Sequence, residues 1–338
     1  MAKSRVGIVV NPLSGKDVRR LVTQASIFTN EEKTNIISRL IMALDSVAVD
    51  EVLLSPDLYG IGERGRNRIE DSIGSCVSFV NVHPDGSPED TLRATRVMRK
   101  EGVGCIVTIG GDGTNRLVAK ESNSIPIVPI STGTNNVFPF MVEATTAGLA
   151  AGLVATWSIR KEETSLRTKR CEVFVDKKMN DIALIDATIT TGQFVGAGAI
   201  WDMSLVSEIV ATQASSASIG MSAIAGGILN ISQHEDSGIY VEIGKNGTKV
   251  LSPIAPGMLI NVDVRSYQIL GLGDSVSVKT SPCVIALDGE RITEIDESVP
   301  VDLSVTRKGP LRVDIDATLL KATERGFLRN RSGISAIR

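Results

Sequence analysis

The sequence has few histidines, few aromatic residues and no long hydrophobic run. Only two of its 338 residues are histidines, His83 and His234, and aromatic residues make up 4%. Two histidines are too few for a histidine-rich metal site, and they argue against a histidine-activated nucleophile. Any chemistry must therefore rest on carboxylates, cations and main-chain amides.

Signals for secretion, membrane insertion and nucleic-acid binding are also missing. No apolar run approaches the roughly 18 residues of a membrane-spanning helix, and the apolar stretch 6–10 is too short for the core of a signal peptide. The net charge of −3 leaves no broad basic surface for nucleic acid or anionic lipid. We therefore expect a cytoplasmic protein with neither nucleic acid nor a membrane as partner.

The four cysteines show no spacing typical of zinc or redox sites. Cys76, Cys105, Cys171 and Cys283 lie far apart, and three of them fall in apolar, strand-like segments. We expect small buried side chains in a reducing compartment.

The first part of the chain alternates apolar runs with helical patterns. Continuous apolar runs predict parallel strands covered on both faces, at 6–10, 52–54, 76–82, 105–109 and 126–130. Helical spacing follows several of them, at 18–25, 30–44 and 87–101. Asn30 is the predicted cap of the second of these helices. Repeated strand–helix units predict an α/β domain with a Rossmann-like parallel sheet at residues 1–142.

After a helix of small residues near 144–157, apolar and polar residues alternate. This period of two predicts strands with one buried face, at 172–176, 239–243, 276–280, 301–305 and 311–316. We therefore expect a β-rich second domain, an antiparallel sheet or sandwich, at 143–325, with a C-terminal tail at 326–338 and a ligand cleft between the domains. The uncharged stretch 211–233 fits either a mobile lid or subunit contact, or a buried helix with small side chains.

The most informative segment is the glycine turn at 110–114, which reads Gly-Gly-Asp-Gly-Thr. It follows an apolar run and precedes a helical stretch that Thr114 could cap. The turn after a parallel strand faces the binding crevice, where glycines let main-chain amides approach phosphate oxygens. The segment therefore predicts a phosphate-binding turn.

Asp112 stands in the middle of this turn, where its charge would repel phosphate. The conflict resolves if the carboxylate accepts a proton or hydrogen bond from a substrate hydroxyl, or faces a metal ion. A general base of this kind typically contributes about 10²–10⁴ in rate. The alternative is that Asp112 only braces neighbouring amides in a tight turn.

Two further polar turns follow predicted strands, at 11–15 and 131–136. Their Asn and Thr side chains are suited to base and ribose edges, and their glycines admit phosphate. Lys16 does not complete a P-loop, because the required earlier glycine is absent and Asp17 replaces the serine or threonine. The G-x-G-x-x-G pattern of dinucleotide-binding domains is also missing after the first strand.

In chain order, four segments resemble signatures of the diacylglycerol kinase/NAD kinase superfamily. They are Asn11-Pro12-x-Ser14-Gly15, Gly110-Gly111-Asp112-Gly113-Thr114, Gly133-Thr134-x-Asn136 and Asp288-Gly289-Glu290. The stretches 11–20 and 194–202 and the helix from Asn30 resemble the AcoX-like branch, described as ATP-NAD kinase-like and tied to acetoin catabolism operons. The resemblance covers almost the whole chain.

This resemblance implies a phosphotransferase that uses ATP, or polyphosphate, with Mg²⁺ and transfers to an alcohol. Asp112 would engage the acceptor hydroxyl. Asp288 and Glu290 would reach back from the second domain, and lipid kinases link such an acidic pair to metal or base function; the alternative is an Asp-Gly hairpin turn. The residues that would surround the nucleotide are Asn11, Ser14, Gly110, Gly111, Gly113, Thr114, Gly133, Thr134, Asn135 and Asn136.

The acceptor pocket departs from both branches of the superfamily. Asn115 and Arg116 stand where lipid kinases place a glutamate, Asn136 stands where they usually have aspartate, and the segments by which NAD kinases hold their substrate are not found. Five cations could supply positive charge to the phosphates, or else be solvated surface residues: Arg116, Lys120, Arg167, Lys169 and Arg170.

The leading hypothesis is a NAD kinase-like enzyme of NADP biosynthesis. The alternatives are a kinase for a lipid or a small catabolic hydroxyl metabolite, and a nucleotide sensor without catalysis. The pI near 5.6 counts against a lipid substrate. The resemblance also implies a homo-oligomer.

Overall fold

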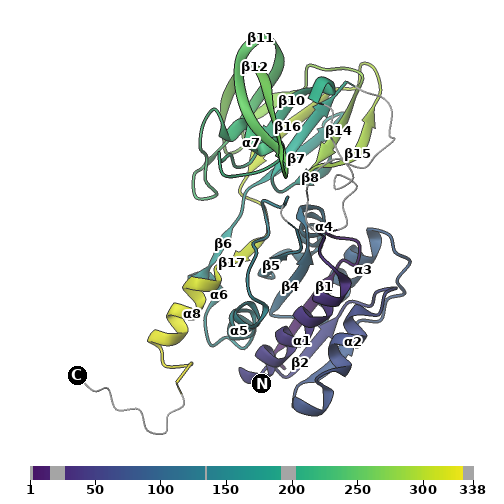
Figure 1. The fold of residues 1–338 in the computed structure, drawn as a ribbon, viewed down its shortest axis with the longest axis vertical. Coiled ribbons are helices and arrows are strands. Elements are labelled where there is room, and N and C mark those ends of the chain that lie inside the picture. Colours follow the sequence, from purple (N-terminus) through teal and green to yellow (C-terminus); the bar gives the residue numbers. More distant parts are fainter. Residues whose placement is uncertain (1–2, 16–26, 134, 192–202, 330–338) are drawn as a thin grey trace, which may run out of the picture.

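The computed structural model describes residues 3–15, 27–133, 135–191 and 203–329. Within these ranges the chain forms an α/β domain and a domain of antiparallel sheets, which lie one below the other in Figure 1. The expected fold class is therefore confirmed. The helix predicted at 18–25 lies outside the described residues.

The first domain is built on a seven-stranded sheet, ordered β3-β2-β1-β4-β5-β17-β6. All neighbours are parallel except β17 and β6, which are antiparallel. The five predicted strands are present, as buried apolar runs or, for β3, a half-buried edge. The strands are β1 (Arg5–Val10), β2 (Glu51–Leu54), β3 (Cys76–Phe79), β4 (Cys105–Gly110), β5 (Ile127–Ser131), β6 (Ser165–Arg167) and β17 (Leu311–Val313).

Helices cover both faces of this sheet. α1 and α5 share an apolar core with one face, and α3 and α4 share another core with the opposite face. The N-cap of α1 is Thr29, whose hydroxyl accepts from the Glu32 amide, and not Asn30 as predicted, because the helix already includes Asn30. The helices are α1 (Asn30–Ser46), α2 (Ile61–Asn67), α3 (Glu89–Lys100), α4 (Asp112–Ser122), α5 (Ala144–Ala155), α6 (Lys161–Thr164) and α8 (Ile315–Glu324).

The second domain consists of two antiparallel sheets packed on a common apolar core. One has the order β12-β11-β10-β9-β14-β15 and the other the order β13-β16-β7-β8. Their strands are β7 (Arg170–Val175), β8 (Lys178–Ala183), β9 (Asp186–Thr190), β10 (Val206–Ala211), β11 (Ser237–Ala255), β12 (Met258–Gly271), β13 (Ser275–Ser277), β14 (Cys283–Leu287), β15 (Glu290–Ile295) and β16 (Val301–Thr306).

The border between the domains differs from the one expected at residue 142. α5 packs against α1, and its alanines belong to the core of the first domain. The stretch 311–316, expected as a second-domain strand, is instead β17 of the first sheet followed by the start of α8. The chain thus enters the second domain after β6 and leaves it before β17, two strands that lie side by side in Figure 1. Residues 330–338 of the expected tail lie outside the described residues.

The uncharged stretch 211–233 contains a short buried helix, α7 (Met221–Gly226), which packs on β10 and β11. This favours the buried-helix interpretation. Three of the cysteines are buried as expected, and Cys76 is exposed. Across the described ranges, the structure contains no helix with the length and apolarity needed to cross a membrane.

Candidate active site

A cavity of about 500 Å³ lies between the two domains. The loops that follow β1, β2, β3 and β5 and the start of α4 form its first-domain wall, and residues 185–186, 219–221 and 288–290 border it from the second domain. Its size falls in the range of small-molecule and cofactor sites. As predicted for a parallel sheet, the carboxyl ends of the strands meet at this cavity.

Most of the predicted site residues come together here. Gly110 and Gly133 are not part of the described cavity wall, and Thr134 and the segment 194–202 lie outside the described residues. The predicted residues that line the cavity are Asn11, Ser14, Gly111, Asp112, Gly113, Thr114, Asn135, Asn136, Asp288 and Glu290.

The loop after β1 is tied to the two neighbouring loops. The Asn11 side chain donates to Thr114 Oγ1 at 2.9 Å, and the Thr132 hydroxyl donates to Ser14 Oγ at 2.8 Å. Lys33 of α1 is fully buried and donates to three carbonyl oxygens of this loop at 2.7–3.0 Å. Sequence reasoning missed Lys33, because a helix lysine ordinarily extends into solvent and no local signal marks this one.

The glycine turn becomes the start of α4. The helix begins at Asp112 with Gly111 as N-cap, so Thr114 lies inside the helix and does not cap it as predicted. A Cβ at Gly113 would lie 2.5 Å from a carboxylate oxygen of Glu290. Glycine at this position therefore lets the second domain approach the turn.

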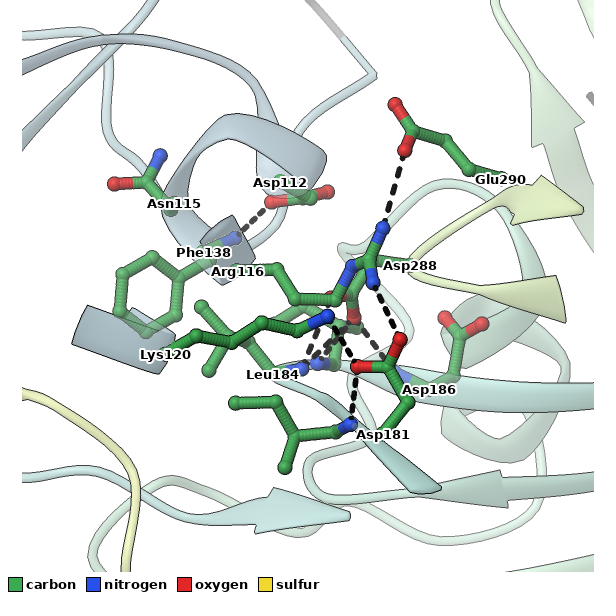
Figure 2. Close-up of polar contacts among 12 residues, drawn as sticks. Asp112, Asn115, Arg116, Lys120, Phe138, Asp181, Leu184, Asp186, Asp288 and Glu290 are labelled. Atoms are coloured by element: carbon green, nitrogen blue, oxygen red, sulfur yellow. Dashed lines mark hydrogen bonds and ion pairs between the residues drawn. The ribbon is translucent and has the colours of Figure 1, made fainter. Parts of the chain in front are cut away.

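Asp112 faces the cavity and also braces the loop after β5. Its Oδ1 accepts main-chain hydrogen bonds from Val137 at 3.1 Å and Phe138 at 2.8 Å, and its Oδ2 accepts from Val137 at 3.1 Å. Figure 2 shows the contact with Phe138. The bracing foreseen as the alternative role is thus present, and Asp112 also lines the cavity.

Two asparagines that depart from the lipid-kinase pattern support the turns. Asn136 donates to Ser131 Oγ at 2.8 Å and closes the turn after β5. Asn115 accepts from Thr108 Oγ1 at 2.6 Å and donates to the Gly111 carbonyl at 2.9 Å. Asn115 therefore holds the glycine turn on β4 and does not line the described cavity wall.

The acidic pair of the second domain forms the hairpin turn foreseen as the alternative, and this turn reaches the cavity. Asp288 and Gly289 form the turn between β14 and β15, with φ of 51° and 81°, and this turn borders the cavity. The Asp288 side chain is fully buried and accepts from the amides of 184, 185 and 186 at 2.7–3.4 Å. Burial raises the pKa of Asp288 to about 6, although Arg116 and these amides act in the opposite direction. The side chain of Glu290, in contrast, is 58% exposed.

None of the five candidate cations lines the described cavity wall. Arg116 and Lys169, which could have been surface residues, are 3% and 0% exposed. Lys169 donates to two carbonyls of the second domain, and Arg170 pairs with Glu172. Arg167 donates to two carbonyl oxygens, and Lys120 pairs with a second-domain carboxylate. Periodicity alone could not predict the partners of Arg116, Lys120, Arg167 and Lys169, because these partners lie far along the chain.

The cavity is acidic within the described ranges. No lysine or arginine contributes to its described wall, whereas six acidic residues do: Asp57, Asp90, Asp112, Asp186, Asp288 and Glu290. Four of the six, Asp57, Asp90, Asp112 and Asp288, accept main-chain hydrogen bonds and brace loops. Among the residues described, no group of three or more His, Cys, Asp or Glu side chains could hold a metal ion.

Comparison with known proteins divides the chain at the same place as the structure. Residues 6–156 match the ATP-NAD kinase N-terminal domain, and residues 169–308 match the acetoin catabolism protein X C-terminal domain. The second match begins after β6 and ends before β17, and so covers the second domain.

Two individual proteins resemble the chain over nearly its full length. It is 33% identical over 337 residues to acetoin catabolism protein X of Cupriavidus necator, which covers 96% of this chain and 94% of that protein. Its fold is similar to that of yeast NADH kinase in complex with NADH, with a TM-score of 0.54 over 99% of this chain and 90% of the other. At 13% identity, this second likeness concerns the fold alone.

Proposed function

Because the chain belongs to the family of acetoin catabolism protein X, the AcoX-like members of the NAD kinase family, we propose that it is a kinase-type phosphotransferase. It moves a phosphoryl group from ATP, or polyphosphate, to an alcohol, with NAD as the first candidate acceptor. One observation carries the proposal: the three polar turns after β1, β4 and β5 and the acidic turn of the second domain meet at one cavity, with Asp112 in its wall.

Phosphoryl transfer requires in-line positioning and charge neutralisation more than covalent help from the protein. Asp112 orients the acceptor hydroxyl and takes its proton while the alcohol oxygen bonds to the terminal phosphorus. The bond from that phosphorus to the bridging oxygen breaks, and ADP leaves. Main-chain amides of the glycine turn and of the loop after β1 contact the phosphates. Mg²⁺ enters with the nucleotide as part of the substrate and offsets the acidic wall, which would repel a bare triphosphate.

A second candidate is a nucleotide-binding protein that transfers no phosphate. The Asp112 carboxylate already accepts from two main-chain amides, as a purely structural aspartate would. Nucleotide binding would then serve as a signal, and the cavity would need no acceptor subsite.

The test is ADP release from Mg²⁺–ATP with a panel of acceptors: NAD, small hydroxyl metabolites and a lipid alcohol. Polyphosphate replaces ATP in a parallel series. Phosphorylation of NAD supports the leading proposal, and turnover with another alcohol corrects the acceptor. Nucleotide binding without turnover on any acceptor supports the second candidate, and absence of nucleotide binding overturns both.

A further inference from the structure

Arg116 is the buried cation at the border between the domains. It lies in α4, one turn after Asp112, with only 4% of its side chain exposed. Its guanidinium contacts three carboxylates of the second domain, Asp181 at 3.5 Å, Asp288 at 3.6 Å and Glu290 at 3.3 Å. Figure 2 shows the guanidinium between these acids.

The charges in this cluster depend on one another. Asp181 also pairs with Lys120 of α4 at 2.7 Å, so two cations of the first domain meet three carboxylates of the second. A buried ion cluster contributes little net stability, because desolvation offsets the attraction, but removal of one partner leaves an uncompensated buried charge. Arg116 therefore favours one relative placement of the two domains over others.

The contacts of Arg116 decide where the second domain lies over the glycine turn. Asp288 braces residues 184–186, and Glu290 sits against Gly113, next to Asp112. One arginine thus joins the helix that begins with Asp112 to the turn that carries the second-domain acids.

We propose that Arg116 is a positioning residue, which holds the Asp288–Gly289–Glu290 turn over the glycine turn and so completes the cavity between the domains. For its effect on turnover this inference rests on the proposed function, whereas its effect on the ligand-free protein does not. Neither Glu290 nor the loop at 184–186 keeps its place at the cavity without the guanidinium.

The first test uses the ligand-free protein and the variants Arg116→Met, Arg116→Lys and Arg307→Met. Arg307 is a control, because it makes several hydrogen bonds, to the second domain and to the Arg167 carbonyl of β6, but none of these partners lines the described cavity wall. Hydrogen exchange at the amides of 184 and 185 should accelerate about tenfold or more in Arg116→Met, partly recover in Arg116→Lys and stay unchanged in Arg307→Met. Equal exchange in Arg116→Met and wild type would overturn the proposal.

The second test measures kcat and KM for Mg²⁺–ATP with the acceptor that the panel identifies. Arg116→Met should lose about tenfold or more in kcat/KM, Arg116→Lys should regain part of it, and Arg307→Met should retain it. Glu290→Gln on the Arg116→Met background should cause almost no further loss in kcat/KM, because both changes disturb the same position of the Asp288–Gly289–Glu290 turn. Fully additive effects would contradict the inference. If wild type transfers no phosphate, the proposed function fails and the exchange experiment alone decides.

If Arg116→Met does not fold, Glu290→Gln and Arg116→Lys replace it in both experiments. These variants keep the buried charges in balance or remove only an exposed carboxylate. Accelerated exchange at 184 and 185 in either variant supports the positioning role, and unchanged exchange in both contradicts it.

Discussion

The glycine turn at Asp112 and the hairpin turn at Asp288 use an aspartate in the same way but differ in solvent access. Each carboxylate accepts main-chain hydrogen bonds from a loop of its own domain, at 137–138 and at 184–186. Asp112 is half-buried and lines the cavity, whereas the Asp288 side chain is 0% exposed and that residue borders the cavity through its main chain.

This difference separates an aspartate whose side chain is fully buried from one that is half-buried and lines the cavity. Bracing a loop does not by itself exclude a chemical role, but a carboxylate that no substrate reaches can act only through its neighbours. Asp112 lines the cavity, and the proposed mechanism assigns the acceptor hydroxyl to it. Asp288 acts through the loop it braces and through the adjacent, exposed Glu290.

The largest expected effect comes from Asp112→Asn. We expect turnover to fall by about 10²–10⁴, because an amide cannot take the acceptor proton. ATP affinity should change little, since the amide oxygen still accepts from the loop after β5. Steady-state kinetics measure the turnover, and calorimetric titration measures the ATP affinity. Asp288→Asn is the control, because it removes the charge of the fully buried aspartate instead. An unchanged rate in Asp112→Asn would refute its assignment as the base.

Each domain also contains a fully buried lysine, and the two lysines can be compared in the same way as the two aspartates. Lys33 and Lys169 are both fully buried and donate to main-chain carbonyls, but only Lys33 supports a loop of the cavity. Lys33→Met and Lys169→Met should each lose about 3 kcal/mol of unfolding free energy, because carbonyls are left unsatisfied. Only Lys33→Met should also weaken ATP binding, by about tenfold, since its loop is expected to contact phosphate. Equal ATP affinities in the two variants would contradict the expected contact between the loop after β1 and the phosphates of ATP.

The pH dependence of stability tests the burial of Asp288. Burial raises its pKa from 3.8 to about 6, so the folded state holds this proton more tightly than the unfolded state. The stability it contributes is complete below pH 3.8 and is lost as the pH rises through 6. The unfolding free energy of wild type relative to Asp288→Asn should therefore fall by up to about 3 kcal/mol between pH 4 and pH 7. Denaturant titrations at several pH values measure this difference, and parallel profiles would contradict it.

Glu290→Gln should have the smallest effect of the series on stability. Its side chain is 58% exposed, so solvent screens its attraction to the buried Arg116 and the contact contributes roughly 0–1 kcal/mol. We expect turnover to fall only about threefold to tenfold, through the weakened contact with Arg116. Thermal unfolding measures the change in stability, and steady-state kinetics measure the change in kcat. A loss as large as that of Asp112→Asn would move the base role to the second domain.

Local patterns were enough to predict the fold class and the three turns after parallel strands. Continuous apolar runs indicate strands covered on both faces, and glycine next to small polar residues indicates where such strands end. The border at 142 was not predictable in this way, because a half-exposed strand such as β17 shows the same alternation in either domain. The cap of α1 was misplaced by one residue, since Thr29 and Asn30 carry equally good capping side chains.

By itself, the sequence determined which chemical groups stand at the ends of the strands, Asp112 among them. Only the tertiary structure decided which charges are buried and which partners they have. Arg116 looked like an exposed helix cation, and its contact with Glu290 spans 174 residues of chain. The physical reason is that strand and turn signals arise from neighbours in sequence, whereas desolvation and pairing of charge arise from segments that meet only after folding.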